Sequence, residues 1–264
     1  MGYGTEIDAE KSEDYYLKAL LYGSDAIMTK IDDLMKVKSS ILKQNRDRYK
    51  EIKMKAREGD ALCQGIEGCC LVYGIFDDKN YDKGFKLLKK SSDSGNAFGQ
   101  KYYGICYYCG FGTKKDLKKS AEITLLSAEQ GFADAQYSYG SMCCNGEGVP
   151  KDEEKGIGWY QRAADQGHSW AQGNIGYCYE RGDFYEKDYA KALKWYRRGA
   201  ERANVVTLGN MGIFYENGYS VEVDLLEAAK WYKLAADRGN VAAKNSFDDI
   251  LKKDKKARAY FEKK

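Results

Sequence analysis

The feature that most constrains this chain is a repeat of 36 residues. Glycine, tryptophan-tyrosine, paired small residues and aspartate return at that spacing through most of the 264 residues. Copies that recur in phase fold into a linear array of similar units, each stacked on its neighbours. The glycines that define the register are Gly68, Gly104, Gly140, Gly176 and Gly212.

Each unit has the signals of two helices joined by a turn. Trp159-Tyr160 and Ala163-Ala164 are four residues apart, so they share helix faces on which a large ring lies beside small residues. Gly146-Glu147-Gly148-Val149 is typical of a tight turn. The unit is therefore predicted to be an antiparallel helical hairpin. A column of N-cap residues opens its second helix, namely Asn80, Asp116, Asp152, Asp188 and Asp224.

Charge and hydropathy exclude several classes of partner. The 43 Lys and Arg nearly balance 40 Asp and Glu, and the net charge of +3 gives no support for nucleic-acid binding. No apolar run approaches the 18 residues that a membrane helix needs. The acidic N-terminus lacks the pattern of a secretory signal, so we expect a cytoplasmic protein without a membrane span.

These columns resemble the Sel1-like repeat family, which is related to the tetratricopeptide repeats. The third unit carries the pattern as Gly140, Gly146-Glu147-Gly148-Val149, Asp152, Trp159-Tyr160 and Ala163-Ala164. The resemblance implies an all-α fold, a right-handed α-α superhelix (solenoid) of 36-residue helical hairpins. The first two units depart from the family, since Leu87-Leu88 and Ile123-Thr124 replace Trp-Tyr, and the fourth unit loses its Gly-x-Gly turn.

The register predicts three regions. Residues 1–58 are expected to form a degenerate capping hairpin, and residues 241–264 a capping helix with a basic tail that extends it or frays. Residues 59–240 hold five repeats between them. These run over about 60–95, 96–131, 132–167, 168–203 and 204–239.

The eight cysteines and the single histidine predict no catalytic, metal or cofactor site. Cys70, Cys106 and Cys178 share one core column, where free Cys acts as a small hydrophobe. Adjacent cysteine pairs do not have zinc-ligand spacing. His168 falls in a loop, where we expect an ordinary structural role. The predicted protein is not an enzyme. A thiol-dependent or hydrolytic enzyme, like β-lactam-associated cysteine-rich relatives, and a small-ligand binder are the alternatives.

The resemblance also implies where a partner would bind. In related arrays the first helices line a concave face, and alignment on the glycine column selects the positions that would face a ligand. Trp170 is the one tryptophan that the repeat does not explain. Packing on a neighbouring helix is the alternative for it. The predicted protein-binding residues are Phe98, Lys101, Tyr108, Tyr137, Ser141, Asn145, Trp170, Tyr177, Glu180, Arg181, Ile213 and Glu216, with Ile105, Asp134 and Asn217 beside them.

The function predicted on this basis is a non-enzymatic scaffold that binds a protein or peptide through that face. The resemblance implies roles in assembly, signalling or host–microbe contact, and it extends to immunity proteins that mask a toxin. No residue in the sequence selects among these roles.

Overall fold

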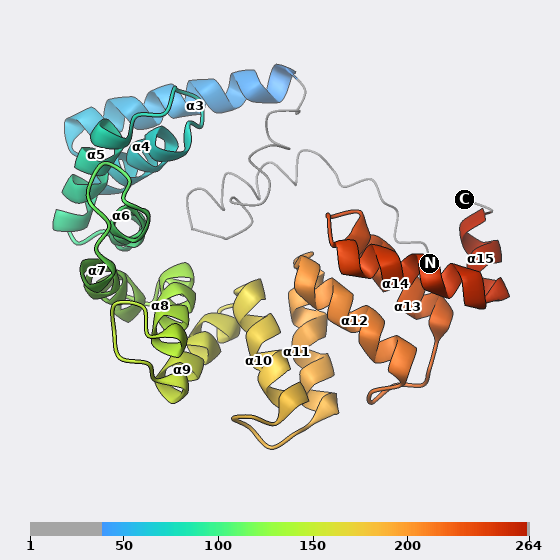
Figure 1. Ribbon diagram of the computed structural model, residues 1–264. Helices are drawn as coiled ribbons and strands as arrows, with labels where there is room; N and C mark the ends of the chain where they lie inside the picture. The colour runs from blue at the N-terminus through green and yellow to red at the C-terminus, as the bar shows by residue number, and fades with distance from the viewer. Residues whose placement is uncertain (1–38, 263–264) are drawn as a thin grey trace. The chain divides into compact units, whose positions relative to one another are not determined.

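The computed structural model describes residues 39–262, and it describes side chains from residue 46 onward. Helices are the regular structure of this part of the chain (Figure 1), which is an all-α solenoid. The helices are α3 (Ser39–Glu58), α4 (Ala61–Tyr73), α5 (Tyr81–Asp93), α6 (Ala97–Cys109), α7 (Leu117–Glu129), α8 (Ala133–Asn145), α9 (Glu153–Asp165), α10 (Ser169–Arg181), α11 (Tyr189–Glu201), α12 (Val205–Asn217), α13 (Leu225–Ala236), α14 (Val241–Lys253) and α15 (Lys255–Glu262).

The chain forms two compact units that meet between Trp159 and Tyr160, inside α9. In the first unit each helix from α3 to α8 packs on the next one, and α4 also packs on α6. In the second unit α10 to α14 pack in the same sequential order, and α15 packs on α13 and α14. The predicted helical hairpins are confirmed. Below, α4, α6, α8, α10, α12 and α14 are called the first helices and α5, α7, α9, α11 and α13 the second helices.

The predicted aspartate column does cap the second helices. The Asp116 carboxylate accepts a hydrogen bond from the backbone N–H of Lys119 at 3.0 Å, and Asp224 accepts one from Glu227 at 2.9 Å. Asn80, Asp152 and Asp188 do the same. Each cap satisfies a backbone donor that the start of a helix leaves without an intrahelical acceptor.

A second column of caps opens the first helices, and the sequence analysis did not identify it. Asn96, Asn204 and Asn240 each accept a backbone N–H of the following helix. His168 fills the same place in α10, where its Nδ1 accepts from the N–H of Ala171 at 3.2 Å. The single histidine therefore has a structural role of the kind we expected.

The turns of the hairpins need residues in the left-handed region. In the third repeat Gly146 and Gly148 have φ angles of 73° and 74°. The fourth repeat keeps only the first of these, Gly182, so its turn has another shape, as predicted. In the first repeat the second position is Phe76, with φ of 67°, which is costly for a residue with a side chain. Its ring stacks on Tyr49 at 5.0 Å between centroids, which helps to hold this conformation.

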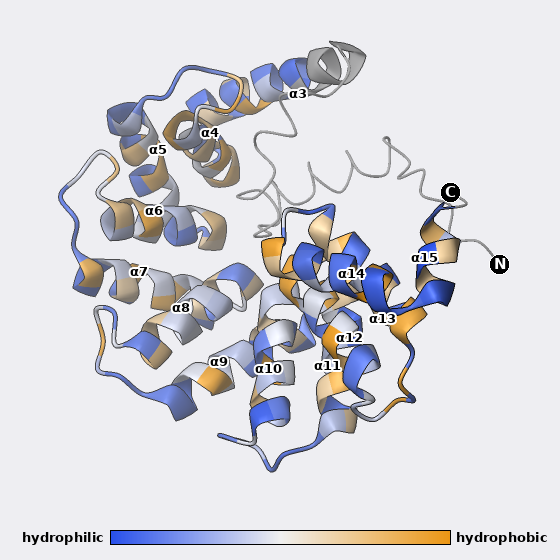
Figure 2. Cartoon of the chain, turned by 45° about the vertical axis from the view of Figure 1, so that its right-hand side comes forward, coloured by the Kyte–Doolittle hydropathy of each residue, from blue (hydrophilic) through white to orange (hydrophobic). Residues whose placement is uncertain are grey.

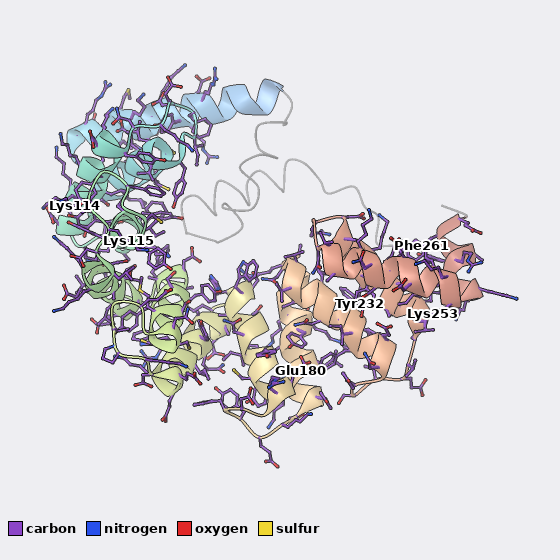
Figure 3. The ribbon with its side chains drawn as sticks, viewed as in Figure 1. Lys114, Lys115, Glu180, Tyr232, Lys253 and Phe261 are labelled. Carbon is purple, nitrogen blue, oxygen red and sulfur yellow. The ribbon has the colours of Figure 1, made fainter. Side chains whose placement is uncertain are left out.

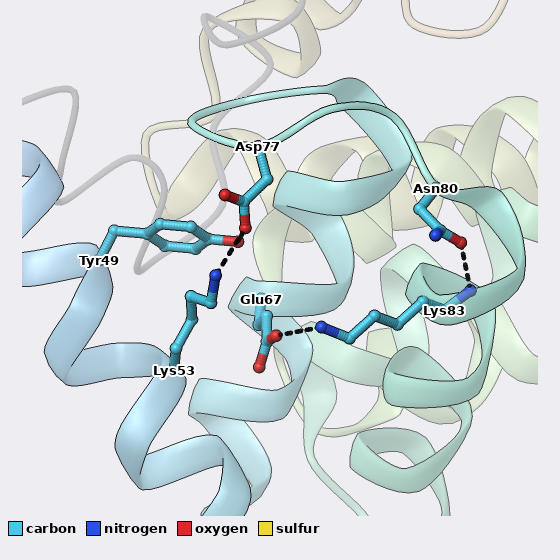
Figure 4. A network of polar contacts seen from close by, with 6 residues as sticks. All are labelled: Tyr49, Lys53, Glu67, Asp77, Asn80 and Lys83. Atoms are coloured by element: carbon cyan, nitrogen blue, oxygen red, sulfur yellow. Dashed lines mark hydrogen bonds and ion pairs between the residues drawn. The ribbon is translucent and has the colours of Figure 1, made fainter.

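Polar contacts fix the turn after α4 to α3 (Figure 4). Asp77 accepts hydrogen bonds from the Tyr49 hydroxyl at 3.2 Å and from Lys53 Nζ at 2.8 Å. Lys83 pairs with the buried Glu67 at 3.1 Å on the other side of α4. In the hydropathy colouring α3 is mainly hydrophilic and α4 mainly hydrophobic (Figure 2). The mainly hydrophilic α3 therefore covers the apolar α4 and closes this end of the described residues.

Two predictions about the ends of the array have different outcomes. Residues 1–38 of the predicted capping hairpin lie outside the described residues, and α3 supplies the rest. The expectation that the basic tail extends the preceding helix or frays is wrong. The backbone becomes extended at Asp254, which ends α14 and caps the separate helix α15. Phe261, marked in Figure 3, packs edge-on against Phe247 at 4.9 Å and holds α15 in place.

The glycine column permits close approach of the two helices of a hairpin. A Cβ atom placed on Gly176 would lie 2.7 Å from two ring atoms of Tyr196, and one on Gly212 would lie 2.5 Å from the ring of Tyr232. Such distances are shorter than van der Waals contact allows. In the fourth and fifth repeats the tyrosine ring of the second helix therefore lies directly on the glycine of the first helix.

The cysteines lie mostly in the core, with one correction. Cys70 and Cys106 are buried as predicted, whereas Cys178 in the same column is half-buried. Burial raises the pKa of the Cys70 and Cys106 thiols to about 12, and it raises that of Cys69 well above its usual value. At neutral pH these three side chains are therefore thiols and not nucleophilic thiolates.

Candidate functional site: a polar pocket between α6, α7 and α8

A pocket of about 220 Å³ lies between α6, α7 and α8 in the first unit. Helices α6 and α8, which are the first helices of two successive repeats, form its walls. Helix α7, which lies between them in the sequence, closes one side. It is lined by Lys101, Ile105 and Tyr108 of α6, Ser120 and Thr124 of α7, Tyr137, Ser138, Ser141 and Met142 of α8, and Glu147 of the following turn.

Hydroxyl groups and one charge of each sign give the pocket its chemistry. Lys101 Nζ donates a hydrogen bond to Ser138 Oγ, which links α6 to α8. The Tyr108 hydroxyl donates to Glu147 Oε1 at 3.2 Å. Burial and the neighbouring Glu147 carboxylate raise the pKa of Tyr108, so its hydroxyl stays protonated and keeps this bond at neutral pH. The pocket can thus both donate hydrogen bonds to a ligand and accept them.

The pocket coincides with a departure from the repeat. Thr124 stands in the column where the second unit has the buried rings of Tyr196 and Tyr232. Gly104, the glycine that faces this column, is retained, and a Cβ atom on it would lie 2.6 Å from Thr124 Oγ1. Thr124 is shorter than tyrosine. No ring therefore fills the space beside it that a tyrosine ring fills in the fourth and fifth repeats.

Four of the predicted binding residues line this pocket. They are Lys101, Tyr108, Tyr137 and Ser141, and Ile105 lies beside them. Three of the four are half-buried, whereas Lys101 is only 7% exposed, because α8 of the next repeat covers it. Lys101 is therefore buried and not at the non-core position that we predicted, although it does line the pocket.

Other predicted residues around the pocket have different positions. Asn145 is exposed at the end of α8, where its amide donates to Ser141 Oγ at 3.3 Å. Phe98 is 3% exposed and packs on Tyr102 and Phe132, so it lies in the core and not at the non-core position that we predicted. Asp134 is also buried and is likewise a wrong choice.

In the second unit the predicted residues divide into exposed and internally bonded groups. Tyr177 of α10 is 52% exposed, and Ile213 of α12 is also exposed. Arg181 is exposed and pairs with Asp183 at 3.3 Å. Asn217 is exposed at the end of α12. Trp170 is half-buried, which agrees with partial packing more than with a fully open position.

Two predicted carboxylates are held by the array itself. Glu180 of α10, marked in Figure 3, accepts a hydrogen bond from the Tyr196 hydroxyl at 2.5 Å. Glu216 accepts one from Tyr232 at 2.7 Å. Both are half-buried, and these hydrogen bonds tie the second helix of a hairpin to the first. Their predicted contact with a partner stays a prediction.

Half of the pocket residues escaped the sequence analysis. Ser120, Thr124, Ser138, Met142 and Glu147 come from three different elements, and only one carried a signal. That signal is the replacement of Trp-Tyr by Ile123-Thr124, which the sequence analysis identifies as a departure from the family pattern without predicting a pocket.

The described residues contain no group of three or more His, Cys, Asp or Glu that would hold a metal ion. Within residues 39–262, no helix has the length and apolar character to cross a membrane.

An array of capped helical hairpins that stack in sequence is typical of helical-repeat proteins. The chain belongs to the Sel1 repeat family, whose model matches residues 1–21, 65–96, 97–132, 133–168, 171–204 and 208–240. The first of these matches lies outside the described residues. This chain therefore has the repeat-scaffold architecture of the Sel1 family.

Solved structures agree with this assignment. A protective antigen with an SLR fold from uropathogenic Escherichia coli strains is 27% identical over 77% of this chain and 44% of its own, with a TM-score of 0.68. A Sel1 repeat protein from Oxalobacter formigenes is 27% identical over 75% of this chain and 57% of its own, with a TM-score of 0.71. The chain thus spans about half the length of these proteins.

A weaker likeness shows the fold alone. An immunity protein from Pseudomonas aeruginosa is 17% identical over 69% of this chain and 67% of its own, with a TM-score of 0.50. No curated protein matches the sequence.

Proposed function

We propose that this chain is a non-enzymatic scaffold that binds a partner protein or peptide through its first helices. The observation that carries the proposal is the pocket between α6 and α8. Side chains from two successive repeats converge on it, including the half-buried aromatic residues Tyr108 and Tyr137. Aromatic side chains that are neither fully buried nor fully exposed are typical of the anchor positions of protein interfaces.

The contacts of the pocket residues suit binding more than chemistry. The one lysine is bonded to Ser138, and the one carboxylate accepts from Tyr108. Neither pairing presents a nucleophile next to a general base. The raised thiol pKa values of the buried cysteines weigh against the thiol-enzyme alternative in the same way. We also place the protein in the cytoplasm, where its cysteines would remain reduced.

Masking of a toxin, as in immunity proteins, and assembly of a complex are two forms that this binding can take. Both need a partner surface that meets the first helices of the array. No cofactor, nucleic acid or membrane has a part in the proposal.

Site-specific photo-crosslinking in cells that express the chain tests the proposal. A photoreactive phenylalanine at Tyr137 should form a discrete adduct with another protein. The same group at Leu126, which is 50% exposed on the second helix α7, is the matched control and should form none. A partner found in this way should bind at least about tenfold more weakly to a chain with Tyr137→Ala and Ser141→Ala. Equal binding by this variant, or equal crosslinking at both positions, would refute the use of this face.

A further inference from the structure

The pocket lies where the second repeat lacks a ring that the fourth and fifth repeats possess. Residues two repeats apart differ by 72 in number, so Thr124 corresponds to Tyr196, and the next repeat has Tyr232. Tyr196 is completely buried and Tyr232 nearly so. The second unit therefore shows which side chains surround a tyrosine ring at this position of the repeat.

In the fourth repeat both the ring and the hydroxyl group of the tyrosine have partners. Its ring lies on Gly176 and meets the Phe214 ring edge-on at 5.3 Å. Its hydroxyl donates to Glu180 at 2.5 Å, and a hydrogen bond from Asn210 lowers the pKa that burial raises. In the fifth repeat Tyr232 has the corresponding partners Glu216 and Ser246.

The second repeat retains a place for such a ring. Gly104 is retained, but Thr124 Oγ1 lies directly against it, so a ring in the pocket would lie beside Thr124, next to the place of the missing tyrosine ring. Met142 stands in the column of Phe214, and Ser138 stands in the column of Asn210 and Ser246. Both of these side chains line the pocket. The apolar neighbour of the ring and the polar neighbour of its hydroxyl are therefore both present.

The polar groups of the pocket match a phenol. A phenol hydroxyl donates one hydrogen bond and accepts another. Glu147 can accept, as Glu180 does in the fourth repeat, and Ser138 and Lys101 can donate. The volume of about 220 Å³ exceeds the roughly 150 Å³ of an engineered cavity that takes up benzene. One substituted aromatic ring fits this space.

We propose that the pocket takes up a tyrosine side chain of the partner protein, whose ring then lies next to the place of the array's own tyrosine in other repeats. The inference rests on the proposed function, because it names the residue that the partner contributes. It makes the site specific for an aromatic ring with a hydroxyl group at its far end.

Titration with p-cresol, the side chain of tyrosine as a free molecule, tests the inference directly. Amide NMR spectra of the full chain should show saturable binding in the millimolar range, with shifts confined to α6, α7 and α8. The compound 4-methylanisole, which has the same ring but no hydroxyl proton to donate, should bind about tenfold more weakly because Glu147 gains no hydrogen bond. No saturable binding of p-cresol, or equal binding of both compounds, would overturn the inference.

A variant that restores the tyrosine of the repeat tests the same inference by changing the protein instead of the ligand. Thr124→Tyr should fill the pocket with the chain's own ring, keep the melting midpoint and reduce p-cresol binding more than tenfold. Leu126→Tyr adds the same residue at an exposed position of α7 and should leave binding unchanged. Undiminished p-cresol binding by a folded Thr124→Tyr variant would contradict the proposal. If that variant does not fold, the comparison of the two compounds on the wild-type chain still decides.

The two proposals can fail separately. If p-cresol does not bind while crosslinking from Tyr137 succeeds, the face binds a partner but not through a tyrosine. If p-cresol binds while crosslinking fails, the pocket accepts a phenol but the scaffold role is wrong.

Discussion

The replacement of Gly176 by valine is the sharpest test of the way in which the hairpins pack. A Cβ atom at this position would lie 2.7 Å from Cδ1 and Cε1 of Tyr196 and 3.3 Å from the Ala192 carbonyl oxygen. The ring cannot move aside, because Tyr196 is completely buried, meets Phe214 and donates to Glu180. The variant must therefore separate α10 from α11 or displace the ring.

The expected cost follows from three contributions. Overpacking by three carbon atoms belongs near the upper end of the range for such changes, about 3 kcal/mol. Weakening of the hydrogen bond between Tyr196 and the Glu180 carboxylate adds about 1 kcal/mol. The better helix propensity of valine offsets roughly 0.5 kcal/mol of this. The free energy of unfolding should fall by about 3.5 kcal/mol, which corresponds to a melting midpoint lower by about 7–14 °C.

Urea unfolding followed by circular dichroism at 222 nm, with thermal melts in parallel, measures this change. The control is Gly158→Val in α9, since a Cβ atom there has no heavy atom within 4 Å. That variant should match or slightly exceed the stability of the wild type. A Gly176→Val variant as stable as the wild type would show that the ring does not lie on this glycine, and it would invalidate the register on which the pocket argument depends.

Three further predictions concern the first unit and the cysteines. Asp77→Asn should lower the stability of the first unit by about 1 kcal/mol, a value reduced for the partial exposure of its pair with Lys53, and should speed amide hydrogen exchange in α3 first. Alkaline pH should also destabilise this unit. Burial raises the pKa of the Cys70 and Cys106 thiols to about 12 and that of Cys69 well above its usual value, whereas all three ionise near about pH 8.5 when unfolded. The free energy of unfolding therefore falls as pH rises from about 9 to 12, by at most about 4 kcal/mol per pH unit. Unfolding titrations at pH 8 and 10 in the presence of a reductant check this, and a Cys106→Ala variant should have a shallower dependence. Thiol titration of the denatured, unreduced chain should find all eight cysteines free; fewer would contradict the cytoplasmic assignment.

The array could be predicted from the sequence because its determinants are local and repeated. The spacing of Asp116 and its equivalents fixes where the second helices begin, and the glycine of each first helix identifies where the helices touch. The caps of the first helices were harder to recognise, since Asp60, Phe132 and His168 interrupt the column of asparagines. A column with mixed side chains gives little signal in one sequence.

The site was predicted less well because exposure depends on the neighbouring repeat. Alignment on the glycine column placed Phe98 and Lys101 on the binding face, but it does not show how far the next hairpin covers that face. Phe132 covers Phe98, and α8 covers Lys101. The consequence of Thr124 was equally hidden, because the missing ring matters only when three helices enclose the space it leaves.

The tyrosine-on-glycine contact has a consequence for how such genes change length. If the segment from Tyr196 to Trp231 were lost by recombination between two copies, Tyr232 would follow Trp195 directly. Its ring would then meet Gly176, its hydroxyl would face Glu180, and Ser246 would take the place of Asn210, so the glycine and the polar partners would be of the same kind as before. Ile250 would replace Phe214 beside the ring, so the exchange keeps an apolar neighbour but loses one aromatic contact. The second repeat differs, because a recombination there would remove Thr124 and close the pocket with a ring, so gain and loss of repeats would change binding before it changed the fold.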